Sequence, residues 1–229
     1  MSGVESCDCV LLAAGLSSRT TDWKMLLPWG EVTMVEASVA AAFPSCARVI
    51  VVAGHRSAEL VSLFRGRQRV QLAVNPRFEQ GMLSSVACGA AAVRTPRFFL
   101  ALADMPLVSP ETYRLLLEAP AVDAVIPKFR GKKGHPLLLT AAVGRAVAAA
   151  APGQTLRDLL AGFGTLLLPV EDPHVLHDVD TDRDYGDLLG DNPAGRDNPE
   201  GRDNPAGRGA APRDAGDTPQ DAGNTPPGR

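Results

Sequence analysis

The feature that most constrains the fold is a regular alternation of short apolar runs with segments that have the pattern of helices. The apolar runs are continuous, as expected for strands that are covered on both faces. Strands of this kind that alternate with helices are typical of α/β proteins with a mostly parallel sheet. We therefore predict a doubly wound α/β fold.

The predicted elements follow one another closely along the chain. One helix has a capping-box start at Thr33 and Glu36, and another begins with Ser109 as N-cap and Pro110 at its first position. Strands are predicted at residues 9–14, 48–53, 70–74, 98–103, 124–127, 137–140 and 166–170. Helices are predicted at residues 33–43, 57–64, 84–93, from 110, and at 141–151, with a final short helix after Thr181 and Asp184.

The composition changes sharply near Leu189, where three six-residue repeats, DNPAGR, DNPEGR and DNPAGR, occupy residues 191–208. Each repeat contains two helix breakers, and no periodic apolar residues follow them. Burial of apolar side chains therefore does not offset the entropy lost on ordering this segment. We predict one folded domain at residues 1–190 and a low-complexity, disordered tail at residues 191–229.

The overall composition excludes several classes of protein. Hydrophobic residues make up 45% of the chain and charged residues 21%, which is close to ordinary globular usage. The net charge of −3 offers no basic field for nucleic acid. No apolar run approaches the roughly 20 residues that span a bilayer, and the N-terminus lacks the basic region of a signal peptide. We expect a cytoplasmic protein that binds neither nucleic acid nor membranes.

The first polar motif follows the first predicted strand. Small residues there let backbone N–H groups approach an anion, and two cations follow that suit phosphate. The alternative is an ordinary turn with two surface cations. Against that alternative, Lys24 is one of only four lysines and the only one before Lys128. The motif residues are Gly15, Ser17, Ser18, Arg19 and Lys24, in the sequence LAAGLSSRTTDWK (12–24).

Carboxylates mark two candidate metal-binding segments. Asp104 directly follows an apolar strand, in the sequence LADMP, and a carboxylate there suits Mg²⁺, which prefers oxygen ligands. The alternative is an aspartate that caps the turn before Pro106. Near the end of the domain, Asp178 and Asp180 alternate with apolar or neutral residues. Asp180 is a candidate second ligand, although capping of the last helix by Thr181 also explains this segment.

A third polar motif, NPRFEQGMLSS, occupies residues 75–85. Asn75 ends a strand, Gly81 precedes a helix, and we expect that helix to start at Ser84 and Ser85. Helix N-termini attract anions and polar ligand groups, so these four residues are candidates for nucleotide binding. Plain turn and N-cap chemistry is the alternative.

A basic, glycine-containing segment precedes Gly134, His135 and Pro136. It contains Lys132 and Lys133, and we consider His135 a candidate contact for an anionic second substrate. A structural histidine beside a solvated basic loop is the alternative interpretation.

Three of these motifs, at residues 15–19, 75–76 and 104–106, follow strands. In open α/β sheets, ligands bind at the carboxyl ends of the strands. We therefore expect the three motifs to converge in space.

In order and spacing, these segments resemble the MobA-like nucleotidyltransferases and, within them, the molybdenum cofactor cytidylyltransferases. The resemblance covers essentially the whole predicted domain and implies a Rossmann-like fold of the nucleotide-diphosphosugar transferase type. The matching stretches are LAAGLSSR (12–19), WKMLLPWG (23–30), VAGHR (52–56), NPRFEQGMLSSV (75–86), LADMP (102–106), GHP (134–136) and DVDTDRDY (178–185).

The resemblance implies that CMP is transferred from CTP to molybdenum-loaded molybdopterin, with release of pyrophosphate. The product, molybdopterin cytosine dinucleotide, is used by molybdenum hydroxylases, so a hydroxylase apoenzyme is a candidate partner. Arg19 and Lys24 would neutralise the triphosphate, and Asp104 would hold Mg²⁺. The residues that would border the base and phosphates are Leu12, Ala13, Ala14 and Gly15.

Two details of the first motif bear on this resemblance. The guanylyltransferase branch tends to show LAGG where this chain shows LAAG, so Ala14 favours CTP. The family usually has Met-Gly after the arginine, where this chain has Thr20 and Thr21. Glycine adopts positive φ readily and threonine does not, so we expect the phosphate loop to follow a different path.

Other functions remain open from the sequence. A guanylyltransferase on the same cofactor and a sugar-phosphate nucleotidyltransferase are alternatives within the same class of enzyme. A non-catalytic carrier, which binds the finished cofactor and passes it to a hydroxylase, is an alternative of another class.

Overall fold

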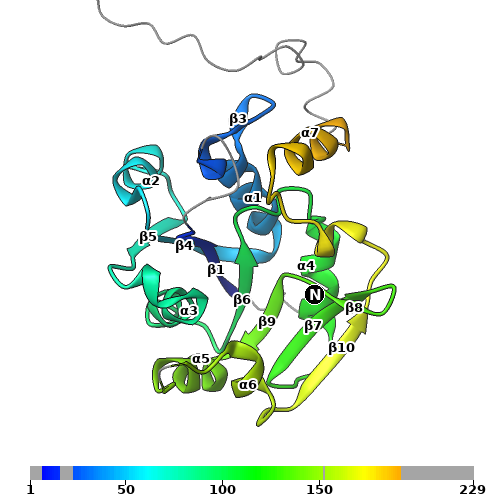
Figure 1. The fold of residues 1–229 in the computed structure, drawn as a ribbon. Coiled ribbons are helices and arrows are strands. Elements are labelled where there is room, and N and C mark those ends of the chain that lie inside the picture. The colour runs from blue at the N-terminus through cyan, green and yellow to red at the C-terminus, as the bar shows by residue number, and fades with distance from the viewer. Residues whose placement is uncertain (1–6, 16–22, 152, 192–229) are drawn as a thin grey trace, which may run out of the picture. The chain divides into compact units, whose positions relative to one another are not determined.

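The computed structural model describes residues 7–15, 23–151 and 153–191. Its central sheet has the strand order β10-β7-β9-β6-β1-β4-β5, and β8 pairs with β7 outside this path (Figure 1). All pairs along this path are parallel except those of β9, which runs antiparallel to both β6 and β7. The strands are β1 (Cys7–Ala13), β4 (Cys46–Ala53), β5 (Val70–Val74), β6 (Arg97–Leu102), β7 (Ala124–Phe129), β8 (Lys132–Lys133), β9 (Leu137–Thr140) and β10 (Thr165–Pro169).

Helices cover both faces of this sheet, as Figure 1 shows. On one face, β1 and β4 pack against α1, α2 and α4 through residues such as Leu11 and Val51. On the other face, the alternate residues Val10 and Val52 pack against α3, α5 and α6. The helices are α1 (Met34–Ala42), α2 (Ser57–Leu63), α3 (Met82–Ala90), α4 (Pro110–Glu118), α5 (Ala141–Ala148), α6 (Leu156–Leu160) and α7 (Asp182–Asp191). Burial on both faces explains why the strands are continuous apolar runs.

The predicted α/β fold with a mostly parallel sheet is therefore confirmed. The two predicted capping signals are also present, since Glu36 accepts hydrogen bonds from the N–H and hydroxyl of Thr33. Ser109 caps α4 by accepting from Glu111 N–H. The predicted domain boundary at residue 190 falls one residue before the end of α7. All described elements lie in the compact unit Met1–Asn198, and Pro199–Arg229 lies outside the described residues.

Four details differ from the prediction. The third α-helix begins at Met82 with Gly81 as N-cap, so it starts two residues before the expected Ser84. The short helix α6 and the two-residue strands β2 (Pro28–Trp29) and β3 (Val32–Thr33) were not expected. The helix α5 ends at Ala148 rather than Ala151. The basic segment around Lys132 and Lys133 is a strand paired with β7 rather than a loop.

Four 3-10 helices connect these elements: η1 (Lys24–Leu26), η2 (Phe43–Ser45), η3 (Phe78–Gln80) and η4 (Pro173–Leu176). Two of them, η1 and η3, follow the chain segments at the carboxyl ends of β1 and β5. None of the helices that the structure describes is long and apolar enough to cross a membrane.

The contact between α3 and the sheet depends on Gly89. A Cβ at this position would lie 2.3 Å from Cγ1 of Val10 and 2.8 Å from Cγ2 of Val52. Both valines are fully buried, so neither has space into which it can move. Only glycine lets α3 approach β1 and β4 this closely.

We predict that Gly89→Ala lowers the free energy of unfolding by about 1–3 kcal/mol, because overpacking displaces side chains in the core. Chemical denaturation monitored by circular dichroism measures the change. The matched control is Gly186→Ala in α7, where a Cβ meets nothing within 4 Å and helix propensity favours alanine. Equal stability of the wild type and Gly89→Ala would contradict the prediction.

Candidate functional site

A cavity of about 530 Å³ lies at the carboxyl ends of β1 and β6. The end of β1 and the residues that follow it form one wall, and η3 with the start of α3 forms another. Lys24 and three aspartates form a charged side. The lining residues are Leu12, Ala13, Ala14, Gly15, Lys24, Met25, Phe78, Glu79, Gly81, Met82, Ser85, Leu102, Asp104, Asp178 and Asp180.

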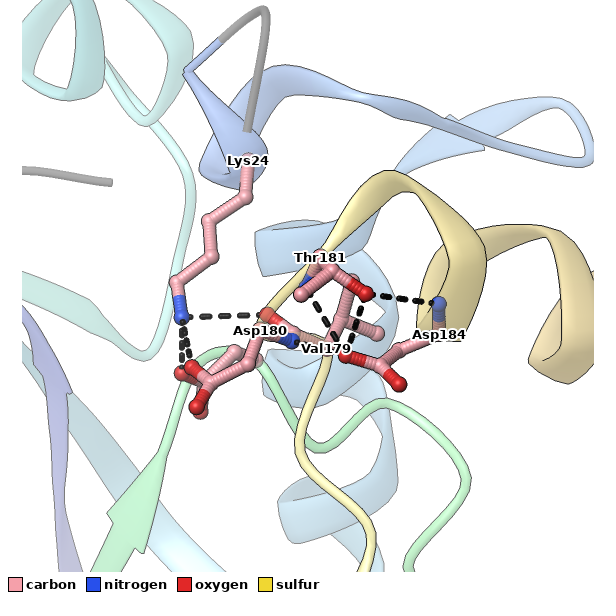
Figure 2. Close-up of polar contacts among 6 residues, drawn as sticks. Lys24, Val179, Asp180, Thr181 and Asp184 are labelled. Carbon is pink, nitrogen blue, oxygen red and sulfur yellow. Dashed lines mark hydrogen bonds and ion pairs between the residues drawn. The ribbon is translucent and has the colours of Figure 1, made fainter. Parts of the chain in front are cut away.

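Lys24 is the centre of the charged side. Its Nζ donates to Oδ2 of Asp104 at 2.6 Å, to Oδ1 of Asp180 at 3.2 Å and to the carbonyl oxygen of Val179 at 3.1 Å. Figure 2 shows this side chain extending from the η1 segment to the loop that carries Val179 and Asp180. An ammonium group has three N–H donors, so all three are used.

The residue Lys24 is only 8% exposed, yet its ammonium stays charged. Burial acts to lower its pKa, but the charge and hydrogen bond of Asp104, followed by those of Asp180, outweigh burial. The net effect is a raised pKa. A nearby carboxylate favours the charged form of a lysine in this way.

Asp104, Asp178 and Asp180 form an acidic cluster whose carboxylate oxygens lie within 4.8 Å of one another. Desolvation raises the pKa of the Asp178 carboxyl, and the charges of Asp180 and Asp104 raise it further. Oδ1 of Asp104 is buried and has no hydrogen-bond partner within the described chain. A buried oxygen without a donor, beside two further carboxylates, fits a hard divalent cation.

The backbone holds the two acidic segments together. The N–H of Val179 donates to the carbonyl oxygen of Asp104 at 2.9 Å, and the Val179 side chain is fully buried. On the C-terminal side, Asp184 accepts from the N–H and hydroxyl of Thr181, both at 2.8 Å (Figure 2). The predicted cap at Thr181 is thus present, and it fixes the loop that carries Asp178 and Asp180.

Gly54 directly follows β4 and lies beside Ala14 and Phe78, which line the cavity. A Cβ at this position would lie 2.6 Å from Cβ of Phe78 and 2.9 Å from Cβ of Ala14. The absence of a side chain therefore lets two cavity-lining residues from separate segments approach one another.

Asn75 directly follows β5 and is not among the cavity-lining residues. It is 2% exposed, and its Nδ2 donates to Oγ of Ser84 at 2.9 Å and to Oγ of Ser85 at 3.0 Å. Its Oδ1 accepts from the N–H of Arg77 at 2.9 Å. The side chain therefore connects the end of β5 to the first turns of α3.

The structure places the predicted nucleotide-binding residues in three groups. Leu12, Ala13, Ala14, Gly15, Gly81 and Ser85 line the cavity. Asn75 and Ser84 lie behind it, and Ser84 donates to backbone carbonyl oxygens of Arg77 and Gly81. Ser17, Ser18 and Arg19, like Thr20 and Thr21, lie outside the described residues. The binding roles of all these residues stay predictions.

His135 is not among the cavity-lining residues. Its N–H donates to the carbonyl oxygen of Val175 at 2.9 Å, its peptide bond to Pro136 is cis, and its Nδ1 is buried without a hydrogen-bond partner in the described segments. Burial lowers the pKa of this imidazole, which favours its neutral form. A contact with a second substrate stays a prediction.

Asp180 was predicted as a metal ligand, whereas Asp178, Phe78 and Met82, which also line the cavity, were not predicted as site residues. Asp178 belongs to the same motif as Asp180, and the alternation of the two carboxylates around Val179 was the signal that could have identified it. Phe78 and Met82 lie between Asn75 and Ser84, in the stretch that resembled the family.

Comparison with known proteins places the chain among nucleotidyltransferases. The MobA-like NTP transferase domain matches residues 9–169. The molybdenum cofactor cytidylyltransferase of Escherichia coli (strain K12) is 32% identical over 178 residues, which are 78% of this chain and 93% of that protein. A probable molybdenum cofactor guanylyltransferase of Bacillus mycoides (strain KBAB4) is 30% identical over 141 residues, 59% of this chain and 68% of that protein.

Solved structures agree with this placement. Rv0371c from Mycobacterium tuberculosis H37Rv superposes with a TM-score of 0.69 at 26% identity, covering 81% of this chain and 98% of that one. Its complex with manganese superposes with a TM-score of 0.66 at 27% identity, covering 80% and 97%. A divalent cation is therefore bound by a structural neighbour.

We predict that Asn75→Ala lowers the free energy of unfolding by about 1–3 kcal/mol, because it removes the hydrogen bonds of the buried Asn75 side chain to the hydroxyls of Ser84 and Ser85 and to the N–H of Arg77. Thermal or chemical unfolding measures the effect, and Gln80→Ala, an exposed change in η3, is the control. Unchanged stability of Asn75→Ala would show that these hydrogen bonds do not stabilise the connection between the end of β5 and α3.

Proposed function

Because the chain belongs to the MobA-like NTP transferase family, we propose that it is a molybdenum cofactor cytidylyltransferase. It transfers CMP from CTP to molybdenum-loaded molybdopterin, releases pyrophosphate and forms molybdopterin cytosine dinucleotide. The observation that carries this proposal is the meeting of Lys24 with Asp104, Asp178 and Asp180 at one side of a nucleotide-sized cavity. The cytidylyltransferase of E. coli, matched over 93% of its length, supports the choice of reaction.

The wall lined by Leu12, Ala13, Ala14 and Gly15 suits the nucleoside. The cavity volume of about 530 Å³ falls within the usual range of about 300–1,000 Å³ for small-molecule sites. Leu12, Ala13, Ala14 and Gly15 bring the backbone of the first motif to the cavity, where its polar groups border the base and the phosphates. Ser85 adds a hydroxyl from α3.

The charged side suits the triphosphate and a metal ion. Asp104, Asp178 and Asp180 would hold Mg²⁺, which suits carboxylate oxygens and commonly binds together with substrate phosphates. When bound, the ion supplies positive charge to the reacting phosphates. CTP carries roughly four negative charges and the pterin phosphate about two, whereas Arg19 and Lys24 supply only two positive charges. This imbalance is the reason to expect a divalent ion.

The reaction needs no covalent intermediate on the protein. A terminal phosphate oxygen of the pterin forms a bond to the α-phosphorus of CTP. The bond from that phosphorus to the oxygen bridging to the β-phosphorus breaks, and this oxygen leaves with the bonding electrons as part of pyrophosphate. The attacking phosphate is already ionised near pH 7, so no side chain must remove a proton. The protein positions the two substrates and neutralises their charge.

Magnesium as the ion, a cytoplasmic location and delivery of the product to a molybdenum hydroxylase are parts of this proposal. A guanylyltransferase is the nearest alternative, because a relative with that name is 30% identical over 141 residues. A carrier would bind the pterin without turnover. A pyrophosphate-release assay with CTP, GTP and ATP, with and without molybdenum-loaded molybdopterin, separates these possibilities.

We predict a higher kcat/KM with CTP than with GTP. Ala14 is 7% exposed and lines the cavity beside Gly54 and Phe78, so its methyl group narrows the base side and disfavours a purine. Steady-state kinetics with both nucleotides and saturating pterin measure the preference. Comparable efficiencies with the two nucleotides would contradict the predicted preference for CTP. Pyrophosphate release with GTP alone would show that the protein is a guanylyltransferase.

We predict that Asp104→Asn lowers turnover at least about a hundredfold, because it weakens charge stabilisation by several kcal/mol. Turnover against Mg²⁺ concentration should show that the variant also needs more Mg²⁺. Asp187→Asn, an exposed change of the same kind in α7, is the control for loss of charge alone. If Asp104→Asn kept wild-type turnover at low Mg²⁺, Asp104 would not be a metal ligand and would only cap the turn.

A further inference from the structure

We propose that Lys24 is a removable internal counter-ion of the acidic cluster. In the nucleotide-free protein its ammonium competes with a divalent cation for the carboxylates, and a bound nucleotide draws it away. This inference rests on the proposed function in one respect, that the cluster of Asp104, Asp178 and Asp180 binds a divalent metal. It adds an order of events, in which metal and nucleotide bind together rather than metal first.

The hydrogen bonds of Lys24 leave its ammonium fully occupied. Its three N–H donors are used by Asp104, Asp180 and the carbonyl oxygen of Val179. No donor is left for a phosphate. Lys24 therefore contacts a triphosphate only after it releases at least one of these acceptors.

Lys24 contacts carboxylate oxygens that a divalent cation would also use. Its ammonium contacts Oδ2 of Asp104 and Oδ1 of Asp180, and it leaves Oδ1 of Asp104 buried without a hydrogen-bond donor in the described chain. A divalent cation that uses both Asp104 and Asp180 would share two carboxylates with a buried ammonium. Charges of the same sign at such a site repel strongly, because little water screens them.

The charge of the cluster also matters. Three carboxylates lie within 4.8 Å, and among the described residues Lys24 contacts two of them. This ammonium carries one positive charge, so the contacts that the structure describes leave the cluster attractive to a divalent cation, which would compete with Lys24 for the same two carboxylates. The phosphates of a nucleotide would offer Lys24 other acceptors, so that it could release the carboxylates to the metal without losing its counter-charge.

Binding of Mn²⁺ alone tests the competition, with free Mn²⁺ followed by electron paramagnetic resonance and without nucleotide. We expect Lys24→Met to bind Mn²⁺ at least about tenfold more tightly than the wild type. Lys128→Met, which removes a lysine far along the chain in β7, should match the wild type. A non-hydrolysable CTP analogue should raise the affinity of the wild type for Mn²⁺ by a larger factor than that of Lys24→Met. Equal or weaker binding by Lys24→Met would overturn the inference.

A measurement on the wild-type protein keeps the inference testable if Lys24→Met does not fold. The chain has four lysines, and Lys24 is the buried one, so its ammonium protons exchange most slowly and give a distinct NMR signal. We expect Mg²⁺ alone to leave this signal in place at millimolar concentration. Mg²⁺ with the CTP analogue should shift or broaden it. A signal unchanged by saturating Mg²⁺ and analogue would overturn the inference.

These outcomes are independent of turnover. Absence of pyrophosphate release from CTP would contradict the proposed function. A tenfold tighter binding of Mn²⁺ by Lys24→Met would still support competition between Lys24 and the metal. Absence of Mn²⁺ binding in every variant would overturn both the metal site and the inference.

Discussion

The charged side of the site depends on the contact between one buried ammonium and acceptors from two distant segments. Lys24 stands 80 residues before Asp104 and 156 residues before Asp180, yet its Nζ lies within hydrogen-bonding distance of both. The raised pKa of Lys24 means that burial does not discharge it. Breaking one partner of a buried ion pair is costly, because it leaves the other charge uncompensated. The start of η1, the segment that follows β6 and the loop before α7 are thus held together by charge as well as by packing.

The loop at residues 170–181 carries two of the three aspartates and needs support of its own. At one end, Oδ2 of Asp172 accepts from Ser109 N–H and from the hydroxyl of Thr112, which attaches the loop to the start of α4. At the other end, Asp184 caps α7 through Thr181, and these hydrogen bonds lower the pKa of its carboxyl. Between them, the buried Val179 joins the backbone of Asp104. The aspartates at 178 and 180 are therefore presented by a loop that is anchored on both sides.

Most of the fold was predictable, because continuous apolar strands and strong capping signals at Thr33 and Ser109 are local features of the sequence. The hairpin β2–β3 was not, since strands of two residues are too short to show a period. Asn75 shows why the roles of site residues could not be predicted as well as the fold. A polar residue at a strand end suits both a ligand contact and a structural role, and only its burial among Ser84, Ser85 and Arg77 N–H points to the second. The ion pair of Lys24 with Asp104 was also not predictable, because it depends on how segments that are distant in the sequence pack together.

The two sides of the cavity differ in how they are maintained without a ligand. The wall that Ala14 and Phe78 line is held by packing, because Gly54 lets Phe78 approach Ala14, and by the hydrogen bonds of Asn75 to the first turns of α3. Such a wall keeps its shape whether or not a nucleotide is present, because close-packed side chains have few alternative positions. The charged side carries the Lys24 ammonium, whose acceptors lie in the protein and, in the proposed reaction, also on the nucleotide phosphates. The wall where we propose that the base binds is thus fixed in shape, whereas the cation beside the proposed phosphate site can change partners. A single lysine that changes partners connects occupancy of the first side with metal binding at the second.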